Sequence, residues 1–183
     1  LAITGLVLAI IVGTQIQETH QPEHVFTFKD ALMGYRELLA TDRFIASALT
    51  TAFQTAVFFA MMGFIAYSFE RMSISPKEFG VWMATTSVGY VIGNLANKRL
   101  LNRYRIEIIT FVGAIASLMC LLLMEIWHTT ALNSPMGLAI PMLLVGLSNG
   151  VIIANSIIIA SSAIPRLRGS ATGLVGAMQM GAG

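Results

Sequence analysis

The stretch from Pro135 to Ser162 contains no charged residue. A membrane-crossing helix needs about 20 apolar residues to pass a hydrocarbon core about 30 Å thick, and this stretch is longer than that. Small residues recur in it and beyond it at helical spacing: Gly146, Gly150, Ala154, Gly169, Gly173, Ala177 and Gly181. Because rows of small residues let helices approach closely in lipid, the chain is predicted to form a bundle of membrane helices.

Composition supports a membrane protein. Of the 183 residues, 56% are hydrophobic and 11% are charged, and the mean hydropathy is +0.76. A soluble domain carries about 25% charged residues, so this chain lacks the polar shell that a soluble core requires. A net charge of +2 is too small to indicate nucleic-acid binding, and the single cysteine, Cys120, excludes a disulfide within the chain.

Hydropathy divides the chain into an all-α, polytopic arrangement. Residues 1–14 read as the end of a membrane helix, and residues 15–43 as a polar loop with an amphipathic helix at Thr27–Leu39. Later spans are predicted at 44–69, 79–96, 106–127 and 136–162, and a further helix starts at 169–183. We expect a fragment cut inside a helix at each end. The missing part would be the N-terminal half of a transporter built from two six-helix halves.

The basic residues predict the orientation. Of the 11 Lys and Arg, all except Arg71 and Lys77 lie in the loops at 15–43, 97–105 and 163–168. Because basic loops are retained on the cytoplasmic side, these three loops are predicted to be cytoplasmic in a multi-pass protein of the inner (plasma) membrane.

Four groups of residues carry a family resemblance. They are Gln17-Glu18-Thr19 after the first helix, the segment SISPKEFG at 73–80, the segment GNLANKR at 93–99, and residues 149–155 taken with 169–174 and 179–181. On these stretches the chain resembles the C-terminal half of a major facilitator superfamily transporter, within it the Bcr/CflA-like drug:proton antiporters. Residues 1–14 would then end the sixth helix, and the four later spans would be the seventh to the tenth, followed by the start of the eleventh.

The resemblance implies a function and its partners. It implies export of small amphipathic compounds through alternating access in the lipid bilayer, with a proton gradient as the coupling ion and no cofactor. It also implies a gating role for the loop signature, here Gly93, Asn97, Lys98, Arg99 and Arg103. Asn97 stands where the family pattern has a carboxylate, and it can hydrogen-bond without carrying charge.

Six side chains are candidates for substrate binding because polar or aromatic groups inside a membrane should face protein or a wet cavity. They are Gln54, Phe58, Tyr90, Asn149, Asn155 and Gln179. Hydrogen bonding between helices is the alternative interpretation for the amides, and both interpretations stay open. The neighbouring pair Gly89 and Gly93 is better explained by helix packing.

Other functions receive less support. The spacing of His20 and His24 resembles a metal pair, but Pro22 between them favours a solvated loop and no metal site. No cluster of His, Asp, Glu or Cys within a span points to an enzyme or a receptor-like protein. Uptake of a sugar or another neutral metabolite remains the main alternative. No carboxylate lies in the middle of a span, so a titrating group for proton coupling is expected in the missing half.

Overall fold

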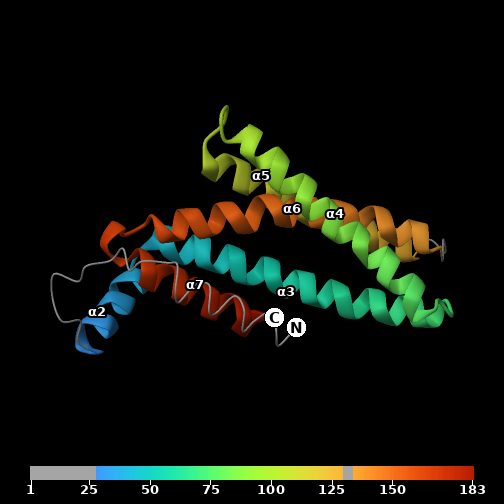
Figure 1. Ribbon diagram of the computed structural model, residues 1–183, viewed down its shortest axis with the longest axis horizontal. Helices are drawn as coiled ribbons and strands as arrows, with labels where there is room; N and C mark the ends of the chain where they lie inside the picture. Colours follow the sequence, from blue (N-terminus) through green and yellow to red (C-terminus); the bar gives the residue numbers. More distant parts are fainter. Residues whose placement is uncertain (1–27, 130–133) are drawn as a thin grey trace, which may run out of the picture. The chain divides into compact units, whose positions relative to one another are not determined.

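The computed structural model describes residues 28–129 and 134–183, and no strand occurs within these ranges. The chain divides into two units, residues 1–32 and 33–183. Figure 1 shows the described helices: α2 (Phe28–Leu39), α3 (Asp42–Arg71), α4 (Pro76–Leu100), α5 (Ile106–Thr129), α6 (Pro135–Ser161) and α7 (Arg168–Ala182). The predicted helix end at 1–14, the loop at 15–27 with both histidines, and the Thr27 cap lie outside the described residues.

Three of the described helices are long and apolar enough to cross a membrane: α3, α5 over Ile106–Ile126, and α6. Helix α4 has 25 residues, but hydroxyl and amide side chains along it and charged residues at its ends lower its hydropathy. The polar residues of α4 include Thr86 and Asn97, which are both buried. The span predicted at 79–96 therefore contains a helix, and its crossing of the membrane stays a prediction.

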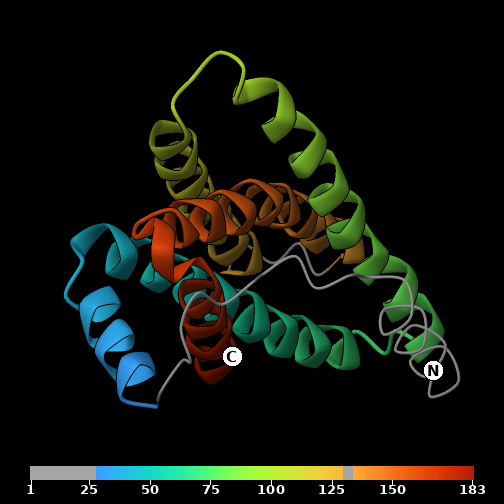
Figure 2. The same ribbon diagram turned by 60° about the vertical axis from the view of Figure 1, so that its left-hand side comes forward.

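Helix α6 is the centre of the second unit. It packs against α3, α4, α5 and α7, whereas α5 packs mainly against α6. Figures 1 and 2 show α4 crossing α6 in both views. The face of α5 turned away from α6 is apolar and exposed, with Phe111, Leu118 and Leu122 among its side chains. This arrangement suits a peripheral helix that contacts lipid.

Short polar sequences start the central helices. Before α4, the Ser75 hydroxyl accepts a hydrogen bond from the backbone N–H of Glu78 at 3.3 Å, and the Glu78 carboxylate accepts one from the N–H of Ser75 at 3.2 Å. This capping box is followed by Pro76, whose missing N–H costs nothing in the first helical turn. Ser134 caps α6 in a similar way, accepting from the N–H of Gly137 at 3.2 Å.

Four glycines set the crossing of α4 and α6. A Cβ placed on Gly89 or Gly93 would lie 2.1 Å from the carbonyl oxygen of Leu143 or Leu147, and one on Gly146 would lie 2.1 Å from that of Thr86. A Cβ on Gly150 would lie 2.4 Å from the Tyr90 carbonyl oxygen. The two backbones therefore touch directly, which only glycine permits on both helices.

Two apolar clusters pack against α6, one near its start and one near its end, with the glycine crossing between them. One joins the last turns of α3 to α5 and the first turns of α6, through Phe69, Met124 and Met142. The other joins α2, the start of α3 and the end of α6 to α7, through Leu38, Phe44 and Ala160.

The end of the bundle near the second cluster also carries ion pairs. Arg43 contacts Glu107 at 3.1 Å, Arg105 contacts the same carboxylate at 3.6 Å, and Arg166 pairs with Glu37. All of these side chains are exposed, so each pair adds little stability. They do show that the turns with most of the basic residues gather at one end of the bundle.

Helix α2 presents two different faces. Gly34 and Leu38 are buried, and a Cβ on Gly34 would lie 3.1 Å from the Leu167 side chain. Three large apolar or aromatic residues of α2, Leu32, Tyr35 and Leu39, are exposed. An apolar stripe left exposed beside basic turns fits a helix that lies at a membrane surface.

Replacing Gly146 by alanine tests the glycine crossing. The new Cβ would meet a backbone oxygen that cannot rotate away, so α4 and α6 must separate. We expect Gly146→Ala to lower the free energy of unfolding of the full-length protein in detergent by about 1–3 kcal/mol. Gly63→Ala is the matched control, because no atom lies within 4 Å of its added Cβ. Equal stability of the two variants would contradict the close crossing.

Candidate functional site

A cavity of about 390 Å³ lies between α3, α4, α6 and α7. Four of the six predicted substrate-binding residues line it, from four different helices: Phe58, Tyr90, Asn149 and Gln179. The remaining lining residues are Thr55, Phe59, Met83, Thr86, Ser87, Val91, Gly146, Ile153 and Met180. The position of Gly146 places the cavity beside the glycine crossing.

The cavity combines apolar walls with neutral polar groups. The rings of Phe58 and Phe59 meet edge to face with centroids 5.8 Å apart, and Tyr90 is partly exposed on the opposing helix α4. None of the lining residues is charged. Such a wall binds apolar and aromatic surface, while a few amides and hydroxyls orient the ligand.

A hydrogen-bond network holds Asn149 in place at this cavity. The Gln54 amide donates to the Ser117 hydroxyl at 2.9 Å and to Asn149 Oδ1 at 2.6 Å. All three side chains are buried, and they join α3, α5 and α6. The bond uses Asn149 Oδ1 and leaves the Nδ2 group of this cavity-lining residue outside the network. Gln54 is not itself a lining residue, so it acts here by positioning Asn149.

Two hydroxyls of the cavity wall have no hydrogen-bond partner within the described chain. Thr55 Oγ1 and Thr86 Oγ1 are both buried and unpaired, and their residues are only 4% and 5% exposed. A buried hydroxyl without a partner costs about 1–3 kcal/mol. Both oxygen atoms are closed off from solvent, so a water molecule or a ligand atom in the cavity would pair with them only after neighbouring side chains move.

Two other hydroxyls of α3 have local partners. Ser47 Oγ donates to the Arg43 carbonyl at 2.9 Å, and Thr51 Oγ1 donates to the Ser47 carbonyl at 3.2 Å. Bonds to the carbonyl four residues earlier satisfy a hydroxyl inside its own helix. The hydrogen of each hydroxyl is therefore used within α3, and neither residue lines the cavity.

Asn155 lies away from the cavity, in a reciprocal pair with Asn97. Asn97 Nδ2 donates to Asn155 Oδ1 at 2.8 Å, and Asn155 Nδ2 donates to Asn97 Oδ1 at 3.0 Å. Asn97 is 5% exposed and Asn155 is fully buried. The predicted role of Asn155 in substrate binding stays untested, and the geometry gives it a structural role between α4 and α6.

The remaining residues of the loop signature are divided between packing and surface. Gly93 belongs to the glycine crossing, whereas Lys98 and Arg99 lie exposed in the last turn of α4. Cations are favourable there because the helix C-terminus carries partial negative charge. Arg103 is exposed in the following turn. The gating role of these residues stays a prediction.

Sequence reasoning missed several members of this site. Ser117 is the anchor on α5, and its signal was a hydroxyl near the middle of a helix that is otherwise almost wholly apolar. Thr86 lies one helical turn before Tyr90, so the spacing could have placed both at one cavity. Phe59 and Met180 could not be recognised from the sequence, because an apolar residue of a membrane helix can equally well face lipid or a cavity. No group of three or more potential metal ligands occurs in residues 28–129 and 134–183.

Comparison with known proteins identifies the family. The sequence model of the Major Facilitator Superfamily matches residues 1–183. The chain belongs to the Major Facilitator Superfamily. No curated protein and no solved structure matches the chain significantly.

Membership establishes the general character of the molecule. Members of this superfamily are membrane transporters, and the described helices α3, α5 and α6 are able to cross a bilayer. Its family and its helices thus identify the chain as a multi-pass, all-helical membrane transporter. The cavity between α3, α4, α6 and α7 is the candidate transport site of this Major Facilitator Superfamily chain.

The amide pair between α4 and α6 can be tested by a double-mutant cycle. Asn97→Ala or Asn155→Ala alone leaves one buried amide without its partner, which should cost about 1–3 kcal/mol in the free energy of unfolding. The double variant leaves neither amide, so its loss should be smaller than the sum of the single losses. Thermal unfolding of the full-length protein in detergent measures all three, and strict additivity would contradict the pair.

Proposed function

We propose that this chain is part of a secondary active transporter that exports small amphipathic compounds by alternating access, coupled to proton entry. The observation that carries the substrate class is the lining of the cavity, in which aromatic and aliphatic walls surround a few uncharged polar groups. An opposite charge in the wall would stabilise a charged substrate, and the lining provides none. The direction and the coupling ion rest on the resemblance to Bcr/CflA-like drug:proton antiporters.

The proposal assigns a task to each part of the site. Phe58, Tyr90 and the neighbouring apolar side chains bind the apolar body of the substrate. Asn149, held by Gln54, and Gln179 provide the directional hydrogen bonds. Because the bond from Gln54 fixes the Asn149 side chain before a substrate arrives, substrate binding does not lose conformational entropy by ordering this side chain.

The proposal also places the coupling group. In the described part of the chain, every carboxylate lies near a helix end or in a turn, as Glu70, Glu107 and Glu125 illustrate. A proton carried through the membrane needs a titratable group inside it. We therefore assign proton transfer to the other half of the transporter.

The orientation completes the proposal. The end that gathers Arg43, Arg105 and Arg166 would face the cytoplasm of a cell whose inner (plasma) membrane holds the protein. Rocking of the two halves would then expose the cavity alternately to each side. No enzymatic step is part of this function.

Uptake of a neutral, polyhydroxylated metabolite is the second candidate. It is favoured by one observation, the unpaired hydroxyls of Thr55 and Thr86 in the cavity wall. A sugar offers many hydroxyl groups that could pair with both. A sugar would bury less apolar surface against the aromatic rings of Phe58, Phe59 and Tyr90 than an amphipathic drug would.

Accumulation assays separate the two candidates. In cells that express the full-length protein, we expect a fluorescent amphipathic dye to accumulate less than in cells with an empty vector. A protonophore should abolish the difference. Unchanged dye accumulation together with increased entry of a labelled neutral sugar would reject export in favour of uptake.

Variants connect the transport to the cavity. Tyr90→Ala removes an aromatic wall, and we expect it to weaken dye binding by roughly tenfold, the equivalent of about 1.4 kcal/mol. Phe111→Ala on α5 is the matched control because this ring is 66% exposed and lies outside the cavity. Binding of the dye to purified protein measures both variants. Equal losses would show that the dye does not bind in this cavity.

A further inference from the structure

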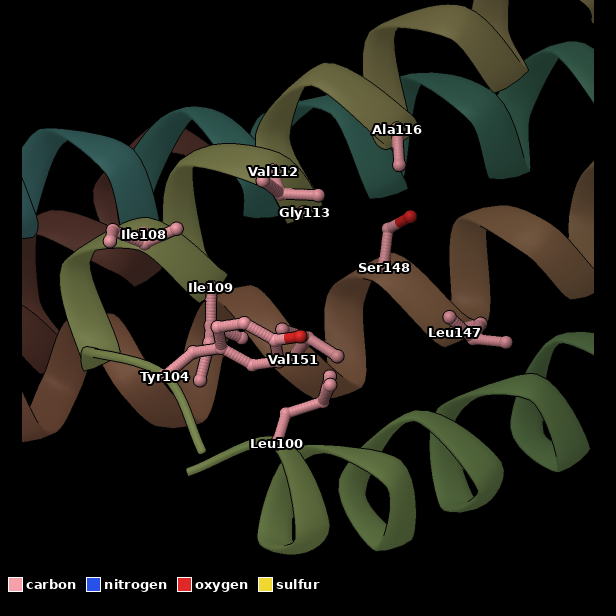
Figure 3. A pocket seen from close by; sticks show the side chains of 10 residues that line it. All are labelled: Leu100, Tyr104, Ile108, Ile109, Val112, Gly113, Ala116, Leu147, Ser148 and Val151. Atoms are coloured by element: carbon pink, nitrogen blue, oxygen red, sulfur yellow. The ribbon is translucent and has the colours of Figure 1, made fainter. Parts of the chain in front are cut away.

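A second hollow lies on the other side of α6. It has a volume of about 320 Å³ between the α4–α5 turn, α5 and α6. Figure 3 shows the side chains around it, with Leu100 from the end of α4, Tyr104 from the turn, Val112 and Ala116 from α5, and Ser148 and Val151 from α6. We call it the α5 groove. Its wall is apolar apart from the hydroxyls of Tyr104 and Ser148.

The α5 groove is separate from the transport cavity. Gly146, Asn149 and Ile153 of α6 line the cavity, whereas Leu147, Ser148 and Val151 line the groove. With 100° between successive residues of a helix, these two sets occupy nearly opposite faces of α6. No residue of α5 lines the cavity. A compound in the transport cavity therefore does not reach the groove.

The shape of the α5 groove fits a single hydrocarbon chain. Its α5 wall extends from Ile108 to Ala116, which corresponds to roughly 12 Å along a helix that rises 1.5 Å per residue. That length is close to one leaflet, about half of a hydrocarbon core 30 Å thick. The groove starts at Tyr104 in the turn and ends near the middle of α5. It thus follows the path of an acyl chain from the membrane surface inward.

The mouth of the groove, formed by the last turn of α4 and the residues that follow it, is strongly basic, and we call it the basic turn. Lys98, Arg99, Arg103 and Arg105 surround the lining residues Leu100 and Tyr104 in sequence, and all four are exposed. Arg105 contacts Glu107 at 3.6 Å. The other three form no ion pair with any part of the chain that the structure describes. Their charge is therefore available to an anion at the membrane surface.

We propose that the α5 groove binds one anionic phospholipid, with an acyl chain along α5 and its phosphate on the basic turn. Basic sites between membrane helices on the cytoplasmic side suit anionic head groups, and arginine forms two parallel hydrogen bonds to a phosphate. A zwitterionic lipid gains less from the same turn because its net charge is zero. A second copy of the chain is a poorer occupant, since a two-fold contact here would bring two basic turns together.

Photo-crosslinking in vesicles tests the proposal. The full-length protein is reconstituted in phosphatidylcholine vesicles that contain a trace of phosphatidylglycerol or phosphatidylcholine with a diazirine near the middle of one acyl chain. We expect the phosphatidylglycerol probe to label residues 106–116 or 147–151 at least about fivefold more than the phosphatidylcholine probe. Equal labelling by the two probes would overturn the proposal.

Charge variants at the two ends of the bundle give the matched control. The triple variant Lys98→Gln, Arg99→Gln, Arg103→Gln should reduce labelling by phosphatidylglycerol to the level of phosphatidylcholine. The variant Arg71→Gln, Lys77→Gln, at the opposite end, should leave it unchanged. These side chains are exposed, so the variants should keep the melting temperature of the parent. An equal decrease in both variants would show unspecific attraction to charge and would overturn the proposal.

Filling the groove tests the acyl-chain part of the proposal. Ala116 is exposed at the inner end of the groove, and Ala116→Phe should reduce labelling at 106–116 and 147–151 by both probes at least about fivefold. Unchanged labelling would overturn the proposed path of the chain. If labelling of the parent protein falls as its density in the vesicles rises, a second copy of the chain covers the groove, and the lipid proposal is overturned.

Discussion

Direct contact between the backbones of α4 and α6 is the constraint on which the rest of this bundle depends. Lipid supplies no hydrophobic drive for helix association, so close packing and interhelical hydrogen bonds must provide it. Gly89 and Gly93 on one helix and Gly146 and Gly150 on the other allow a contact that a single Cβ would block. The Asn97–Asn155 pair then joins the same two helices beyond the crossing. With α4 fixed on α6, the transport cavity opens on one side of α6 and the α5 groove on the other.

Buried polar groups make the second contribution to this arrangement. Gln54 joins three helices through Ser117 and Asn149, and the reciprocal asparagine pair joins two. In a hydrocarbon surrounding, an amide without a partner costs several kcal/mol, so each amide selects the helix arrangement that satisfies it. Asn149 serves both needs, because it belongs to this network and also lines the cavity. The wall of the proposed transport site is thereby set by the same bonds that stabilise the fold.

The fold could be predicted from the sequence to a large extent, whereas the site could be predicted only in part. Runs of apolar residues and the turns between them specify helices in lipid almost directly, because every backbone group must be satisfied within its own helix. The same reasoning selected Phe58, Tyr90, Asn149 and Gln179 as candidates, and the structure brings these four around one cavity. It could not distinguish Asn149 from Asn155, since both are amides in one apolar helix. Their partners, Gln54 and Asn97, lie far away in sequence, and only the packing of the helices decides which amide remains available.

The central claim is that the cavity beside the glycine crossing is the transport site, so that Tyr90 and Met180 in its wall meet water, whereas the exposed face of α5 contacts lipid. Thiol labelling of the full-length protein tests it most directly. Single cysteines are placed at Tyr90, Met180, Phe111 and Leu122 in a Cys120→Ala background, and a small hydrophilic maleimide is added to both sides of the membrane. The account predicts rapid labelling at Tyr90 and Met180 and little at Phe111 and Leu122. Rapid labelling on α5 with protection of the two cavity positions would contradict it.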